Sequence, residues 1–171
     1  DVSTIASTYV RFSFALPFAL VLFFIYFREV SVINEILNQP GFLINVTLAS
    51  IFQVIFTFLL LYLFKFSNFV VGTSLSKTEV VQVAIFEYLI LNEKLSKLGI
   101  SGIIISTLGV MILSIKDLKL FIQNIFSKTT LIGLISCLFL AISIVYFRSA
   151  ALSLENFNSN FEKVVSTLLF G

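Results

Sequence analysis

Residues 74–93 read SLSKTEVVQVAIFEYLILNE, and this stretch decides what kind of fold the chain adopts. It has the length and apolar content of a membrane helix, because about 20 residues cross a hydrocarbon core of roughly 30 Å. It nevertheless carries Lys77, Glu79, Gln82 and Glu87. A charged side chain at the centre of a bilayer costs roughly 2.5–3.5 kcal/mol on insertion scales. The stretch therefore predicts a membrane helix whose charged side chains either pair with other groups of the protein or take part in its function.

The composition of the whole chain indicates an integral membrane protein. Of its 171 residues, 58% are hydrophobic and 12% are charged, whereas soluble domains have about 45–50% apolar and about 25% charged residues. The net charge is only +2, and the chain has no basic run that would indicate a nucleic-acid partner. Histidine is absent and Cys137 is the single cysteine, so the common nucleophile pairs and thiolate metal sites are excluded. We expect no enzymatic activity, no metal and no cofactor.

Apolar segments of spanning or near-spanning length divide the chain. Five are complete, and no run alternates strongly enough to predict a strand; they are residues 10–27, 42–64, 69–91, 98–115 and 131–152. Residues 161–170 open a sixth span, and residues 116–130 have the apolar face of an interfacial helix. We therefore predict an all-α, polytopic membrane protein. Because the chain starts at Asp1 rather than Met and stops within an apolar stretch, we expect a fragment.

Local signals refine these spans. Pro17 predicts a kink in the first span, because proline removes one backbone hydrogen bond. Residues 39–41, Gln-Pro-Gly, predict a break before the second span. If the spans alternate in direction, five basic residues fall on each side of the membrane. The positive-inside rule therefore predicts no orientation.

The second span carries a polar face. Asn45, Ala49, Gln53 and Thr57 recur every four residues, and Ser50 lies beside them. These side chains either line a pathway or hydrogen-bond neighbouring helices, and the pattern leaves both alternatives open. Two further stripes consist of small residues, which let another backbone approach closely. We interpret both as helix packing; they are Gly102, Ser106 and Gly109 in the fourth span, and Gly133, Cys137 and Ala141 in the fifth.

Residues 63–113 resemble the EamA domain of the drug/metabolite transporter superfamily. The resemblance rests on the run from Leu91 to Ser96, LNEKLS, which is similar to the family's "LGE-(R/K)-L-S" helix end, and on the glycines spaced through the next helix. Residues 131–150 resemble the helix that opens the family's second repeat. Asn92 stands where the family usually has glycine, and Glu87 stands where a small residue is common. These two departures bear on which substrate subgroup of the family the chain resembles, and they leave the resemblance to the family itself unchanged.

Such transporters have ten helices in two inverted five-helix repeats. The resemblance implies that residues 1–115 are a first repeat without its first helix. Residues 116–130 would be an interfacial connection, and residues 131–171 the truncated start of a second repeat. It also implies a multi-pass protein of a bacterial inner membrane, with the turn 92–97 on the cytoplasmic side.

The function implied by the resemblance is secondary transport. The protein would export small metabolites, such as amino-acid-like solutes, by alternating access about a midplane site. Its partners would be membrane lipid, a small-molecule substrate and a coupling proton, and a homodimer is a further hypothesis. The alternative is a non-transporting membrane scaffold or subunit whose polar residues contact a partner helix.

The charged residues of the third span are the candidate site. Lys77 and Glu79 point about 200° apart on a regular helix, so they cannot pair along one face. Either the helix breaks near residues 72–76 or each finds a partner elsewhere, such as Gln53 or Asn45. The expected substrate or proton pathway comprises Lys77, Glu79, Gln82, Gln53, Asn45 and Thr57.

Individual roles follow from charge. Lys77 would hold a carboxylate, and Glu79 an amine or a proton. The alternative for both is a buried ion pair or hydrogen-bonded set that locks helix packing. Glu87 lies near enough to the interface to be simply hydrated, and Glu93 is expected to act in packing or gating at the helix end.

Overall fold

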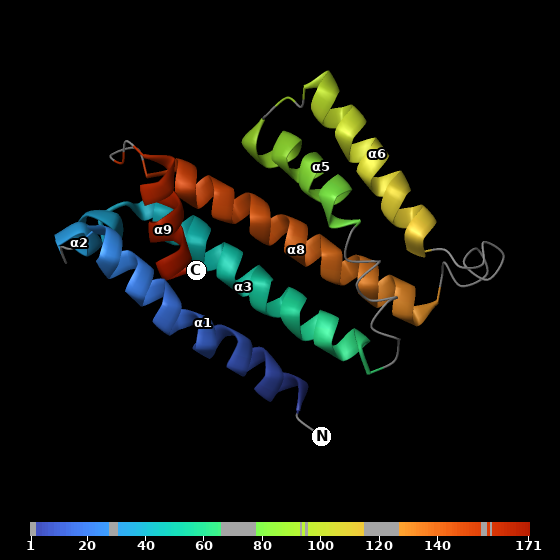
Figure 1. The fold of residues 1–171 in the computed structure, drawn as a ribbon, viewed down its shortest axis with the longest axis horizontal. Coiled ribbons are helices and arrows are strands. Elements are labelled where there is room, and N and C mark those ends of the chain that lie inside the picture. Colours follow the sequence, from blue (N-terminus) through green and yellow to red (C-terminus); the bar gives the residue numbers. More distant parts are fainter. Residues whose placement is uncertain are drawn as a thin grey trace. The chain divides into compact units, whose positions relative to one another are not determined.

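The chain is all-helical over the residues that a computed structural model describes (Figure 1). These are residues 3–27, 31–65, 78–92, 94, 96–114, 127–154, 157 and 159–171, without the side chains of residues 31, 110, 111, 113 and 114. Their helices are α1 (Thr4–Phe27), α2 (Ser31–Leu37), α3 (Pro40–Leu63), α5 (Glu79–Leu91), α6 (Lys97–Ser114), α8 (Lys128–Leu152) and α9 (Asn160–Phe170). The prediction of an all-α membrane protein is confirmed.

Three of the described helices, α1, α3 and α8, are long and apolar enough to cross a membrane. They match the predicted first, second and fifth spans, but α1 and α8 begin earlier than predicted, at Thr4 and Lys128. The fourth span appears as α6, and the third as α5, whose first expected residues lie outside the described part of the chain. Most of the predicted interfacial segment also lies outside it, namely residues 116–126 of 116–130.

Both prolines lie within helices. Pro17 is inside α1, which continues through it as one α-helix; membrane helices tolerate this loss of one backbone bond. Pro40 is the first residue of α3, where the missing N–H has no helical acceptor in any case. The Gln-Pro-Gly break is therefore the junction between the short helix α2, which was not predicted, and α3.

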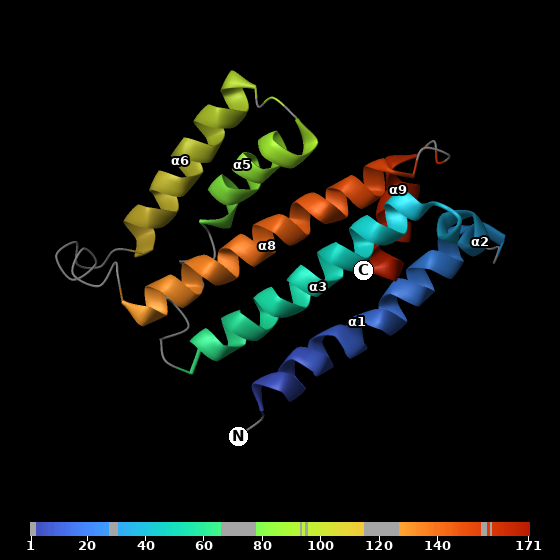
Figure 2. The ribbon, with the colours of Figure 1, turned by 180° about the vertical axis from the view of Figure 1, so that it is seen from behind.

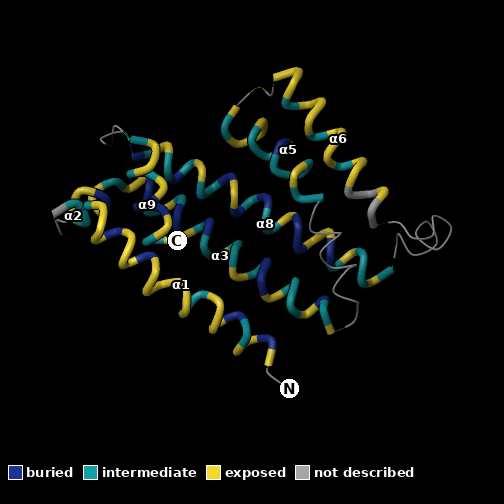
Figure 3. The backbone as a smooth tube through the Cα atoms, viewed as in Figure 1, coloured by how far each residue is buried: buried dark blue, intermediate teal, exposed yellow. Residues whose placement is uncertain are grey.

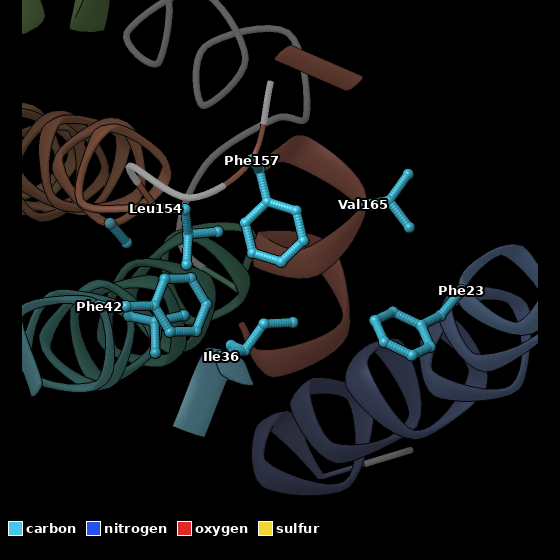
Figure 4. Packing of buried hydrophobic residues seen from close by; sticks show 8 residues of the cluster. Phe23, Ile36, Phe42, Leu154, Phe157 and Val165 are labelled. Atoms are coloured by element: carbon cyan, nitrogen blue, oxygen red, sulfur yellow. The ribbon is translucent and has the colours of Figure 1, made fainter. Parts of the chain in front are cut away.

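The chain divides into two compact units. Unit 1 comprises Asp1–Phe52 and Ser143–Gly171, and unit 2 comprises Gln53–Ile142. The core of unit 1 gathers side chains from α1, α2, the first half of α3 and the C-terminal part of the chain. Figure 4 shows Ile36, Phe42, Leu154 and Phe157 around one interior, with Phe23 and Val165 nearby. Phe23 also lies against Phe27, with 4.7 Å between the ring centroids.

Helix α9 packs against α1 within unit 1 (Figure 1). Its start is defined by a capping box: the Ser159 hydroxyl accepts from the N–H of Phe161, and the Glu162 carboxylate accepts from the N–H of Ser159. This reciprocal arrangement satisfies backbone donors that a helix end leaves open. The sixth apolar segment therefore begins as a capped helix at Asn160.

In unit 2, α5 and α6 form a helical hairpin; both ribbon views show the two helices side by side (Figures 1 and 2). The turn begins at Asn92, whose φ of 54° and ψ of 23° place it in the left-handed region. Glycine is the usual residue in that conformation at a helix end, and asparagine also occupies it. Asparagine at position 92, where the resembling pattern has glycine, is thus the replacement that a left-handed backbone tolerates best.

Among the helices long enough to span a membrane, α1 leaves most of its residues exposed. In α1 only Thr4, Thr8, Ala19 and Phe23 are buried, and they fall on one face at helical spacing. Figure 3 shows the same contrast along α6, where most of the described residues are exposed. Large apolar side chains such as Phe18 and Ile112 lie on these exposed surfaces. Faces of this composition suit contact with lipid.

Replacing Phe23 with alanine is expected to destabilise the protein by about 3–5 kcal/mol, because a cavity is left in a packed core. Phe18 is 72% exposed on the same helix whereas Phe23 is fully buried, so Phe18→Ala is the matched control and should change stability little. Thermal unfolding in detergent measures both. Equal losses in the two variants would contradict the assigned core.

Candidate functional site

The candidate site begins at the first turn of α5. Glu79 is the first helical residue and Thr78 precedes it as the N-cap, without a hydrogen bond from its side chain to the helix end. Both residues are half-buried. A carboxylate is favoured at this end of a helix, because the free N–H groups carry partial positive charge worth roughly 0.3–1 kcal/mol. The backbone thus helps to hold a negative charge at Glu79.

The start of α5 lies beside α8 within unit 2. The side chains of Thr78 and Ser136 hydrogen-bond the Cys137 side chain, and Glu79 is close enough to Cys137 to interact with it electrostatically. Ser136 also donates to the carbonyl oxygen of Gly133 at 2.7 Å. Ser136 and Cys137 are buried. We call Thr78, Glu79, Ser136 and Cys137 the Glu79 cluster.

Gln82 follows Glu79 by three residues and so lies on the same side of α5. Its side-chain oxygen, Oε1, is buried and has no hydrogen-bond partner among the described residues. Leaving a buried acceptor unpaired costs roughly 1–3 kcal/mol. Glu79 and Gln82 together present an anion and an unused acceptor, which suits a ligand that carries several hydrogen-bond donors.

Two predicted residues fall outside the described part of the chain. They are Lys77, the expected carboxylate partner, and Glu93, the expected helix-end residue. Their roles remain predictions. Glu87 is half-buried on α5, four residues before the helix ends at Leu91, which is about 6 Å along the axis.

The polar stripe of α3 is shared between the two units. Gln53 and Thr57 belong to unit 2, where Thr57 is buried and donates its hydroxyl to the carbonyl oxygen of Gln53 at 2.9 Å. Asn45 belongs to unit 1. The amide nitrogen of its side chain lies 3.4 Å from the hydroxyl of Ser153. Asn45 therefore reaches the C-terminal end of α8, and its pathway role remains a prediction.

Ser143 and Ser50 add three polar contacts around α3 in unit 1, of which the one between Ser50 and Val46 lies within α3 itself. Ser143 of α8 donates to the carbonyl oxygen of Ala49 at 2.9 Å. The Ser50 hydroxyl lies 2.7 Å from the carbonyl oxygen of Val46 and 3.1 Å from that of Gly171. Hydrogen bonds of this kind join membrane helices, although each contributes only about 0.6 kcal/mol on average. They support the packing interpretation for this half of the stripe.

The two small-residue stripes differ in their surroundings. Gly133, Cys137 and Ala141 of α8 are all buried. Gly102, Ser106 and Gly109 of α6 are all exposed, and a Cβ atom added at either glycine would meet nothing within 4 Å among the described residues. The close approach predicted at the α6 stripe therefore remains a prediction.

The sequence predicts Cys137 as a packing residue and does not single out Ser136. The structure places both beside the start of α5. The available signal was the position of Ser136 next to a small-residue stripe in an apolar span. That signal does not say which neighbouring helix the stripe faces, and only the tertiary arrangement brings Thr78 and Glu79 to it.

Comparison with known proteins gives one match. The EamA-like transporter family matches residues 1–115, which is 115 of the 171 residues and includes the α5–α6 hairpin. No curated protein and no solved structure matches the chain.

Asn92→Ala is expected to destabilise the protein by roughly 1 kcal/mol, because the Cβ atom of alanine crowds the following carbonyl oxygen in the left-handed region, which asparagine adopts more readily. Asn92→Gly should be neutral or stabilising, since glycine adopts this conformation freely. The midpoint of thermal unfolding in detergent compares the two variants. If the alanine and glycine variants unfolded at the same temperature, the left-handed conformation assigned to Asn92 would be wrong.

Proposed function

The chain belongs to the EamA-like transporter family, and from this premise we propose that it moves a small amine-bearing solute across the membrane. Members of the family are membrane transporters rather than enzymes, and the apolar helices fit a multi-pass integral membrane protein. The substrate class, the mechanism and the direction are our proposals. We propose alternating access, export, and a bacterial inner membrane as the location.

The observation that carries the substrate class is the pairing of Glu79 with Gln82. Glu79 is a half-buried carboxylate, and the Oε1 atom of Gln82, one turn along, is a buried acceptor without a partner among the described residues. An ammonium group has three N–H donors and no acceptor. It would donate to the unpartnered Oε1 atom of Gln82, and its charge would offset the cost of the Glu79 carboxylate in a low-dielectric site.

The remaining parts of the proposed site follow from the same chemistry. The Thr78 and Cys137 side chains would hold the start of α5 against α8 and so position Glu79. Lys77, which precedes this turn in sequence, would bind the carboxylate of an amino-acid-like solute. A proton could occupy Glu79 when the solute leaves, and this exchange would couple transport to a proton gradient. Gln53 and Thr57 are proposed to line the pathway from α3.

The alternative is a non-transporting scaffold or subunit that binds a partner helix. The exposed Gly102–Ser106–Gly109 stripe favours this alternative, because small residues without a neighbour leave room for another backbone. A measurement of flux separates the two hypotheses, since a scaffold would move no solute whichever residue is changed.

Glu79→Gln is expected to lower flux at least tenfold, because the variant keeps the size of the side chain but removes the charge that balances an ammonium group. The measurement is counterflow of labelled amino acids in vesicles that contain the protein. Glu87→Gln is the matched control on the same helix and should retain flux. Undiminished flux in Glu79→Gln, with flux present in the wild type, would contradict the site.

Gln82→Leu separates a functional role from a structural one. Removing a buried unpaired acceptor should raise stability by about 1 kcal/mol, while the loss of a substrate contact should raise KM roughly tenfold or more. Thermal unfolding and flux measured on the same preparation give both values. A variant that is less stable and transports normally would show that Gln82 acts only in packing.

A further inference from the structure

The α5–α6 hairpin contains a groove that the proposed transport site does not use. Its volume is about 400 Å³, and all of its lining residues are apolar except for the phenol of Tyr88. The five from α5 are Val81, Ala84, Ile85, Tyr88 and Leu89, and the three from α6 are Ile100, Ile103 and Ile104. Such a lining offers almost nothing to a polar solute.

The length of the groove matches one leaflet of a bilayer. Leu89 lies near the turn and Val81 lies eight residues away along α5, which is about 12 Å at 1.5 Å per residue. One leaflet contributes about 15 Å of a hydrocarbon core that is roughly 30 Å thick. The groove therefore runs from the surface side of the hairpin to about the depth at which an acyl chain ends.

The lining of the groove suits an alkyl chain. Its walls are apolar side chains from both helices, and an alkyl chain is a single row of methylene groups that meets such walls at contacts of about 4 Å.

Positive charge stands at the mouth of the groove. Lys94 and Lys97 are exposed in and beside the turn. Lys97 precedes Ile100 by three residues and Ile104 by seven, so it lies on the groove side of α6 at the surface end. With Glu93, the turn carries a formal charge of +1. Basic side chains beside a membrane attract anionic headgroups.

We propose that this groove binds one anionic phospholipid, with an acyl chain between α5 and α6 and the phosphate beside Lys97 and Lys94. The serine between them, Ser96, accepts from the N–H of Gly99 at 3.0 Å, and this bond caps the start of α6, whose first residue is Lys97. The bound lipid covers an apolar surface that includes Ile85, Leu89 and Ile104, each more than half exposed. The site acts independently of the Glu79 cluster.

The test measures which lipid stays with the protein. The protein is reconstituted in nanodiscs of phosphatidylglycerol and phosphatidylcholine in equal parts, extracted in mild detergent and weighed intact by native mass spectrometry. The wild type should retain one phosphatidylglycerol in preference to phosphatidylcholine. Lys97→Gln should reduce that preference about fivefold, as the loss of one surface lysine predicts. Ile104→Phe should fill the groove and lower retention of both lipids.

Matched variants control each change. Lys65→Gln removes an exposed lysine that lies outside the hairpin, and Ile105→Phe enlarges the neighbouring residue, which does not line the groove; both should retain lipid like the wild type. Leu89→Phe fills the groove from α5 if Ile104→Phe folds poorly. Equal retention in Ile104→Phe and Ile105→Phe, no preference for phosphatidylglycerol, or a dimer mass without bound lipid would each overturn the proposal.

Discussion

Every polar group inside a membrane must find a partner within the protein, and this constraint organises the chain. The hydroxyl groups show how it is met. Eight serine and threonine hydroxyls donate to a carbonyl oxygen three or four residues earlier in the sequence, so they need no other helix. Three buried side-chain oxygens have no partner among the described residues: the hydroxyls of Thr4 and Ser166 in unit 1, and the Oε1 atom of Gln82 in unit 2. A buried acceptor such as Gln82 Oε1 that has no hydrogen-bond partner is a reason to look for a ligand.

The helices could be predicted from the sequence because their cause is local. A run of about 20 apolar residues has few alternatives to a helix in a bilayer, since all backbone groups must be satisfied within the segment. The early starts of α1 and α8, at Thr4 and Lys128, were missed because polar residues at a span end still continue a helix. The short helix α2 lacks the length that makes apolar periodicity visible.

The candidate site could be predicted only in part. The spacing of Glu79 and Gln82 places them on one side of a helix whatever the tertiary fold is. The neighbourhood of Cys137 could not be predicted, because two similar small-residue stripes have opposite surroundings. Gly133, Cys137 and Ala141 are buried, whereas Gly102, Ser106 and Gly109 are exposed. Which stripe meets a partner depends on helix packing, and sequence spacing does not encode it. The left-handed turn at Asn92 is an intermediate case, since residue type permits it but does not require it.

The central claim is that an ammonium group of the solute lies between Glu79 and Gln82. The most direct measurement is the dipolar coupling, by solid-state NMR in lipid, between the amine of ¹⁵N-labelled amino acids and the ¹³C-labelled side-chain carboxyl and amide carbons of the protein. The account predicts that the amine nitrogen lies within about 4 Å of the Glu79 carboxylate oxygens, the usual limit of an ion pair, and couples to the Gln82 amide carbon. Bound solute without coupling to either carbon would contradict it.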